Sequence, residues 1–283
     1  MSKFNIFFLL FYFSMLFCDD LNGYRFISSS SHKKYLYEVD VINEFQQNNF
    51  SFMGTFTGRL ATKFVADTSF KHGEIKVVQT WSNIISTNRR NDDVKPNYDA
   101  QKLEGCIFTI VMDSTGTTEY TEGNNDLARE TISEMESFSS MFGANNFIYP
   151  FGSDSLRKVG DVWSVKEESH LEAFSGMDDF DGTRKVVNTY TFKKTKKKKG
   201  DLIAVINSDQ TIELEGIFQN WDETYEVQQT GLFKGKMEFN LTKNYFQSSK
   251  MGGELSGYSK SLRDDDEDRF VMYFDLKFKN KVE

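Results

Sequence analysis

The amino-acid sequence predicts a mainly β (α+β) protein: one large, curved antiparallel sheet or open half-barrel of about ten strands, with one helix packed on its concave face. Apolar and polar residues alternate with period two along many segments, as they do in strands that have one buried face and one solvated face. Short turn sequences rich in Gly, Asn, Asp and Ser separate these segments, which is typical of a meander. A single segment shows helical spacing instead.

The alternation is clearest in three segments. In 233–241, Phe233, Met237 and Phe239 alternate with charged or polar residues, and 56–66 and 270–278 repeat the pattern. Such regular alternation predicts an antiparallel sheet that is covered on one side only. Seven further strands are predicted at 34–42, 75–85, 106–112, 162–167, 186–193, 202–207 and 246–258.

The segment 124–142 is the predicted helix. Asn125 or Asp126 can cap its start, and Gly143 suits its end. Because its apolar side needs cover, we expect it to pack against the apolar face of the sheet. The apolar residues that recur at helical spacing are Ala128, Ile132, Met135, Phe138 and Phe142.

The first residues indicate export. Residues 4–17 form an almost continuous apolar run after Lys3, too short to span a bilayer as a helix, so residues 1–18 are predicted to be a signal peptide. Either Cys18 carries a lipid or cleavage occurs beside it; Phe17 stands where a lipoprotein signal has a small residue. We therefore expect a protein of the periplasm, the cell surface or the extracellular space.

The rest of the chain is expected to form one domain. Residues 19–33 are predicted to be a flexible N-terminal segment, and 34–283 a single antiparallel β domain. Its two meander halves, about 34–121 and 162–283, are joined by the helix 124–142. If Cys18 is removed, Cys106 is the one cysteine left, so stability must come from the core rather than from an internal disulfide.

The start of the second half carries the most distinctive motif. Pro150 prevents a helix from continuing, Gly160 and Asp161 form a turn, and Trp163 is expected to anchor the next strand in the core. In the order of its parts the chain resembles a family of uncharacterised bacterial envelope proteins: a leader, a first meander, a short helix, the motif Val-Gly-Asp-x-Trp and a second meander. Those proteins commonly have Phe-Pro and a shorter spacer, whereas here Tyr149 precedes the proline. The architecture that this resemblance implies is similar to periplasmic lipoprotein carriers, in which a curved sheet closed by a helix forms a hydrophobic cup; no catalytic residues come with it.

Charge and missing motifs argue against several functions. The net charge of -8 argues against a nucleic-acid partner. The patterns of serine hydrolases, P-loops and zinc proteases are absent from the sequence, and the three histidines, His32, His72 and His170, lie far apart. We therefore expect no metal, no cofactor and no enzymatic activity, with a carboxylate-based hydrolase as an alternative because acidic residues are plentiful.

Three charged segments each allow two interpretations. Residues 178–182, with Asp178, Asp179, Asp181 and Gly182, are either a solvated loop or a calcium loop. Residues 264–268 are either a charged hairpin tip or a weak site for a divalent cation. The lysine run 193–199 is either a solvated turn or a contact for anionic lipid head groups.

The first functional hypothesis is a binding protein for a hydrophobic ligand. Phe, Trp and Tyr make up 15% of the chain, and these residues either line an apolar cavity or fill a core. A lipid or acyl chain would lie between the sheet and the helix, and the predicted ligand-binding residues are Met135, Phe138, Met141 and Phe142. The alternative is a structural or protein-interaction module of the envelope with a filled core. Contact with a membrane would be peripheral or through a lipid on Cys18.

Overall fold

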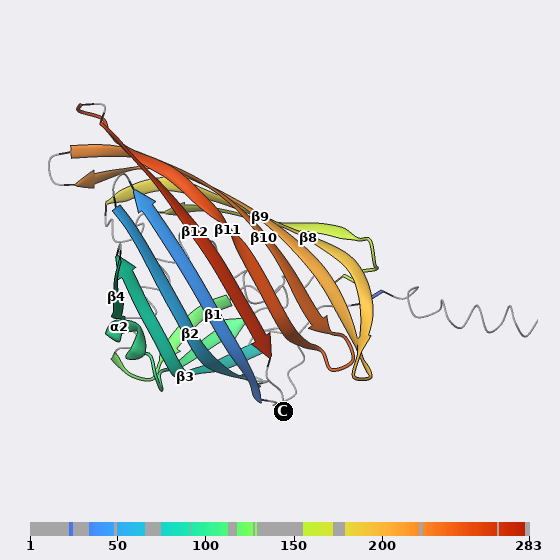
Figure 1. Cartoon of the computed structure of the whole chain (residues 1–283). Helices are drawn as coiled ribbons and strands as arrows, with labels where there is room; N and C mark the ends of the chain where they lie inside the picture. The colour runs from blue at the N-terminus through green and yellow to red at the C-terminus, as the bar shows by residue number, and fades with distance from the viewer. Residues whose placement is uncertain are drawn as a thin grey trace, which may run out of the picture.

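The sheet dominates the molecule. The computed structural model describes residues 23–24, 34–47, 50–65, 75–90, 92–112, 118–126, 128, 155–171, 179–220, 223–264 and 266–280. Within these ranges twelve strands form one sheet, in which every strand pair is antiparallel. The sheet is strongly curved, and its long strands arch across the molecule (Figure 1). The predicted mainly β fold class is confirmed.

The strands fall into two groups along the chain. The first group contains β1 (Lys34–Gln47), β2 (Phe50–Val65), β3 (Ile75–Arg90), β4 (Asp93–Pro96), β5 (Ile107–Met112) and β6 (Thr118–Gly123), with the short helix α2 (Tyr98–Gln101) between β4 and β5. The second group contains β7 (Val162–Leu171), β8 (Phe180–Lys198), β9 (Asp201–Asn220), β10 (Glu223–Asn240), β11 (Tyr245–Ser261) and β12 (Glu267–Asn280).

The order of the strands joins these groups at the middle of the sheet. The order is β6-β5-β3-β2-β1-β12-β11-β10-β9-β8-β7, and β4 pairs with β3 beside this path. The first strand therefore pairs with the last, in a register that runs from Tyr37 opposite Asn280 to Gln47 opposite Phe270. In the described part of the chain, β6 and β7 form the two ends of the path.

Two details of the sequence prediction were wrong. About ten strands were predicted, and all ten lie where they were expected, but β4 and β6 were missed. All four residues of β4 are exposed, so the strand has no buried alternation to recognise. The prediction of a single helix also missed α2. Asn97 caps this helix, because its Oδ1 accepts a hydrogen bond from the Ala100 amide (3.2 Å).

Most of the predicted helix 124–142 lies outside the described residues. Of this segment the structure describes 124–126 and 128, and Asp126 and Ala128 have helical conformation. The Ala128 amide donates a hydrogen bond to Asn125 Oδ1 (2.7 Å), as at the first turn of a capped helix. Ala128 is buried and packs with Cys106 and Phe108, so the start of the segment lies against β5.

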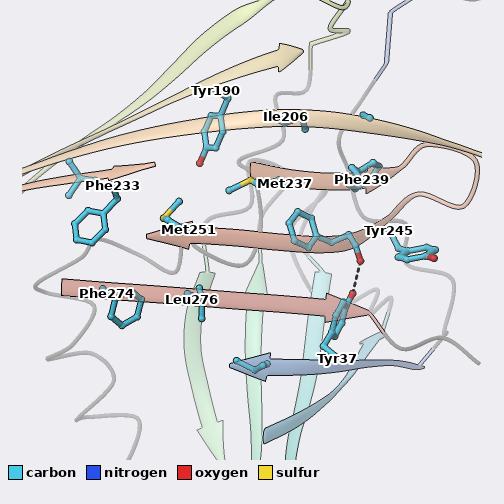
Figure 2. Close-up of a cluster of buried hydrophobic side chains, with 14 of the residues drawn as sticks. Tyr37, Tyr190, Ile206, Phe233, Met237, Phe239, Tyr245, Met251, Phe274 and Leu276 are labelled. Atoms are coloured by element: carbon cyan, nitrogen blue, oxygen red, sulfur yellow. Dashed lines mark hydrogen bonds between the residues drawn. The ribbon is translucent and has the colours of Figure 1, made fainter. Parts of the chain in front are cut away.

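One face of the sheet, called here the inner face, carries the main hydrophobic core. In β10, Phe233, Met237 and Phe239 are buried, whereas Lys234 and Lys236 on the opposite, outer face are exposed. Figure 2 shows this cluster, in which side chains from β1 and β8–β12 lie together. The Tyr37 hydroxyl donates a hydrogen bond across the cluster to the carbonyl oxygen of Phe246 (3.2 Å).

Trp163 anchors β7 in this core, as predicted. Its side chain is 7% exposed and stacks on Tyr190, with ring centroids 5.5 Å apart. Before it, Gly160 has φ of 98°, and Asp161 Oδ2 accepts a hydrogen bond from the Lys158 amide (2.8 Å). A positive φ suits glycine, which explains this residue in the turn.

Irregular pairing at three places bends the long strands. In β3, Asn83 has a positive φ of 53° at the point where the register with β2 shifts. Glu104 holds this bulge, because its carboxylate accepts hydrogen bonds from the Asn83 amide (3.1 Å) and the Ile84 amide (3.2 Å). The register also shifts between β8 and β9 and between β10 and β11. Bulges increase the twist of a strand and re-aim its side chains.

The β8–β9 hairpin has a tight turn, and side-chain hydrogen bonds hold Asp201, the first residue after the turn. Lys199 and Gly200 both have positive φ, as in a type I′ turn. Asp201 Oδ2 accepts hydrogen bonds from Lys243 Nζ (2.8 Å) and Asn240 Nδ2 (2.9 Å). The hydrogen bonds from Lys243 and Asn240 hold the pKa of Asp201 below its ordinary value.

This lowered pKa predicts a pH-dependent effect of Asp201→Asn. A carboxyl whose pKa is lower in the folded protein adds stability above its unfolded pKa of about 3.9, and that stability is lost as the pH falls through the folded pKa. We expect the variant to have a lower urea midpoint than the wild type at pH 7 and the difference to shrink below about pH 4. Asp209→Asn, which removes an exposed carboxylate from the same strand, is the control. A difference that does not change with pH would contradict this assignment.

Candidate functional site

A band of buried polar side chains crosses the inner face where β8 and β9 pair. Asn188 lies opposite Gln210, and Tyr190 lies opposite Ser208. All four residues are at most 2% exposed. They are called the polar band below, and Trp163 of β7 borders them through its stacking on Tyr190.

Asn188 Oδ1 and Ser208 Oγ of the polar band are fully buried and have no hydrogen-bond partner among the described residues. Leaving a buried polar atom without a partner costs about 1–3 kcal/mol, so native proteins keep few of them without a reason. Asn188 and Ser208 are diagonal neighbours on adjacent strands, which places the two atoms in one neighbourhood.

An apolar wall adjoins the polar band on the same face. It is formed by inward side chains of β10, β11 and β12, of which Figure 2 labels Phe233, Met237, Met251, Phe274 and Leu276. Its members are Phe233, Met237, Met251, Leu255, Phe274 and Leu276. Met side chains adapt to differently shaped apolar neighbours better than branched ones do. The inner face thus combines one broad apolar surface with a few fixed polar groups.

A partly buried ion pair lies beyond the polar band toward the edge strand β7. Arg184 of β8 donates from Nη2 to Glu167 Oε1 of β7. The Arg184 side chain is 7% exposed and the Glu167 side chain 34% exposed. Arg184 points inward, and Glu167 compensates its positive charge, because burying a charge is costly unless the charge is paired.

The structure places the residues that the sequence singled out as follows. The four predicted ligand-binding residues, Met135, Phe138, Met141 and Phe142, lie outside the described residues, as do His32 and His72. His170 is exposed on β7, with Nε2 3.7 Å from Asp181 Oδ1. In the described ranges no cluster of three or more His, Cys, Asp and Glu side chains could hold a metal ion.

The three charged segments have different surroundings. Phe180, Asp181 and Gly182 of the segment 178–182 belong to strand β8 rather than to a loop. Residues 262–266 connect β11 to β12, so the acidic segment 264–268 includes the tip of a hairpin, as predicted. The lysine run 193–199 forms the end of β8 and its turn. None of the helices in the described part of the chain is both long and apolar enough to cross a membrane.

The outer face contains a groove that the sequence analysis missed. The groove has a volume of about 590 Å³ and is lined by side chains of β1, β8, β10, β11 and β12. Six lysines line it, Lys198, Lys234, Lys236, Lys250, Lys277 and Lys279, together with the carboxylates of Glu38, Asp40 and Glu238. It is called the lysine groove below. Its floor includes Gly252 and its wall includes Gln247.

A second hollow of about 660 Å³ continues the lysine groove along the strands. The two share Lys234, Lys250 and Gly252. The second hollow is more apolar and acidic, because Ile42, Leu232 and Tyr273 line it beside Glu44, Glu254 and Asp275. Leu232 is 67% exposed there. Lysines therefore outnumber carboxylates in the first hollow but not in the second.

The lysine groove is hard to find in the sequence because each lysine sits at an ordinary outward position of a strand. Lys234 and Lys236 alternate with core residues in β10, as do Lys277 and Lys279 in β12. The pairing register puts them side by side, with Lys250 of β11 opposite both Lys236 and Lys277. The one feature of the sequence that could have indicated the groove is the presence of lysines at outward positions of the three consecutive strands β10, β11 and β12.

No protein-family model matches the chain, and no curated protein matches it. The inner face and the lysine groove are therefore the features of the molecule that indicate a function.

Proposed function

We propose that this protein is an exported, non-enzymatic envelope protein that binds a hydrophobic ligand, a lipid or an acyl chain with one polar group, against the inner face of the sheet. The observation that carries the proposal is the pair of buried atoms without partners, Asn188 Oδ1 and Ser208 Oγ, beside the apolar wall. Ligand sites are mostly apolar and use a small number of fixed polar groups to orient the ligand.

The chemistry of the two atoms defines the polar group of the ligand. Asn188 Oδ1 accepts a hydrogen bond, and Ser208 Oγ both donates and accepts. A hydroxyl, a protonated carboxyl or an amide satisfies both atoms at once. The hydrocarbon part would lie along the apolar wall, where burial contributes about 25 cal/mol per Å² of apolar surface.

The segment 124–142 supplies the other side of the site in this proposal. Its sequence predicts an amphipathic helix, and Met135, Phe138, Met141 and Phe142 are the residues proposed to contact the ligand. The packing of Ala128 on Cys106 and Phe108 fixes where this segment starts. Exchange of the ligand would require this segment to move away from the sheet.

The two alternatives have less support. The first alternative is a structural or protein-interaction module whose core is filled by protein alone. In such a module the unpartnered atoms of Asn188 and Ser208 would have no use, because apolar side chains at these two positions would make the protein more stable. A carboxylate-based hydrolase needs two carboxylates that flank the bond to be cleaved. Among the carboxylates of the lysine groove, Glu38 and Asp40 lie beside each other on β1, and Glu238 forms an ion pair with Lys196. This arrangement gives the hydrolase less support than the two unpartnered atoms give to a binding protein.

Native mass spectrometry of the mature protein, purified from its envelope without detergent, tests the proposal. We expect a stoichiometric adduct of lipid size, and at least a tenfold loss of affinity for the released lipid in an Asn188→Leu, Ser208→Ala variant. Thr211→Ala, on the outer face of the same strand β9, is the matched control and should bind normally. Charged substitutions at Phe138 and Met141 test the contribution of the segment 124–142 in the same assay.

A clean apo mass, together with no binding of offered lipids, would overturn the proposal and leave the filled core. Equal binding by the wild type and the double variant would show that Asn188 and Ser208 do not orient the ligand. The double variant is expected to remain folded, because each change removes a buried polar atom that lacks a partner.

A further inference from the structure

We propose that the lysine groove on the outer face is a binding site for a phosphate-bearing anion, separate from the ligand surface on the inner face. The groove contains six lysines and three carboxylates, whereas the whole chain has a net charge of -8. Its local charge is thus opposite in sign to that of the protein. Such a focused positive potential attracts anions even to an acidic protein.

The lysines are arranged so that they repel one another. Lys250 lies directly opposite Lys236 on one side and Lys277 on the other. Lys234 and Lys279 are its diagonal neighbours on the same two strands. Like charges directly opposite each other destabilise a sheet, so this arrangement costs stability unless an anion occupies the centre of the cluster.

Protein carboxylates compensate part of this charge. Asp209, Asp40 and Glu38 lie opposite Lys234, Lys277 and Lys279 in the neighbouring strands, whereas no carboxylate lies opposite Lys236 or Lys250. Asp275 pairs with Lys277 (3.5 Å), and Glu238 pairs with Lys196, which lies outside the groove. In the described part of the chain, Lys234, Lys236 and Lys250 form no ion pair and no side-chain hydrogen bond. The centre of the groove therefore offers three exposed ammonium groups that the described side chains do not hold.

The backbone around the groove makes room for a ligand. Gly252 lies between Lys234 and Asp275 in the sheet, so no side chain projects from the floor at this point. The β10–β11 register shift leaves Gln247 without a partner in β10, and both Gln247 and Ser248 line the groove. A bulge beside a groove is a common means of aiming a side chain at a ligand.

The number and type of charges favour phosphate over carboxylate. A lysine ammonium is a compact point charge with three donors and is a usual partner of phosphate. Three more lysines than carboxylates line the groove. A monocarboxylate brings one negative charge, while a phosphate monoester carries about -1.5 to -2 at pH 7. The ligand is either a soluble phosphate ester or the head group of a phospholipid, which share this chemistry.

Isothermal titration calorimetry at low ionic strength, with inorganic pyrophosphate as the soluble probe, tests the site. Vesicles of phosphatidylcholine with and without an anionic phospholipid test the head group in a sedimentation assay. The variant Lys250→Thr removes the centre of the cluster, and Lys166→Thr, which removes an exposed lysine from β7 outside the groove, is the matched control. We expect at least a tenfold weaker binding for Lys250→Thr and less than a twofold change for Lys166→Thr.

The thermal midpoint of the free protein provides a second readout. Lys250→Thr should melt above the wild type at low salt, because it relieves repulsion in an unoccupied groove. Binding of pyrophosphate alone assigns a soluble ligand, and binding of anionic vesicles alone assigns a head group. If neither probe binds the wild type, or if Lys250→Thr and Lys166→Thr bind equally, the proposal is overturned whatever the inner face binds.

Discussion

Replacing Gly253 by alanine is expected to destabilise the protein by about 3 kcal/mol. Gly253 of β11 pairs with Phe233 on one side and Phe274 on the other, and both aromatic side chains are buried on the inner face. A Cβ atom at this position would lie 2.2 Å from the Leu232 carbonyl oxygen and 2.6 Å from Phe233 Cα. Both contacts are with backbone, which cannot move without disturbing the pairing of β10 with β11.

Gly252→Ala is the control, because the neighbouring residue points to the opposite face. A Cβ there would lie 3.2 Å from the Phe274 carbonyl oxygen, which requires a shift of a few tenths of an ångström. We expect its cost to stay within about 1 kcal/mol, since alanine also restricts the unfolded chain. Urea midpoints measure both variants, and equal midpoints would mean that the close approach at Gly253 can relax.

Removing Glu167 is expected to have the second largest effect. Glu167→Gln leaves the Arg184 guanidinium buried on the inner face without its carboxylate. Breaking a buried pair from one side costs about 3–5 kcal/mol. We expect about 2 kcal/mol here, because Glu167 remains partly exposed to water.

A second ion pair on the same two strands provides the matched control. Lys185 and Glu168 lie 3.8 Å apart on the outer face, and both side chains are about half exposed or more. Glu168→Gln should cost less than about 1 kcal/mol. Replacing both partners of the buried pair, by Arg184→Met with Glu167→Leu, should recover most of the loss. Equal urea midpoints for Glu167→Gln and Glu168→Gln would contradict this prediction, because another group would then compensate the charge of Arg184.

The sequence predicts the strands well where the inward residues are large and apolar. In β10, Phe233, Met237 and Phe239 mark the buried face correctly. The strand was predicted to start too late, because its inward positions nearer the start include Gln229 and Gly231, which hide the alternation. The strand β6 (Thr118–Gly123) was missed for a related reason, since its sequence TEYTEG has one large apolar side chain.

Both candidate surfaces were invisible to the sequence for one physical reason: they are made by the register between strands. Asn188 and Ser208 interrupt apolar patterns that are 20 residues apart in the chain, and the pairing of β8 with β9 makes them neighbours. Lys236, Lys250 and Lys277 come together in the same way. A one-residue slip of either pairing would turn every side chain of a strand to the other face, so periodicity alone cannot supply these contacts.

The pairing of β1 with β12 has a consequence for how the sheet assembles. Every other step in the order of the sheet joins strands that are close in the chain, whereas this step joins residues more than 200 positions apart. Because the start of β1 lies opposite the end of β12, a short hairpin between them would produce one uninterrupted meander from β7 to β6. A circular permutant with that hairpin would have a much lower contact order and should fold faster. In the natural chain order, one edge of β1 stays unpaired during folding until β12 has formed. This unpaired edge is the part of the sheet most prone to wrong strand pairing.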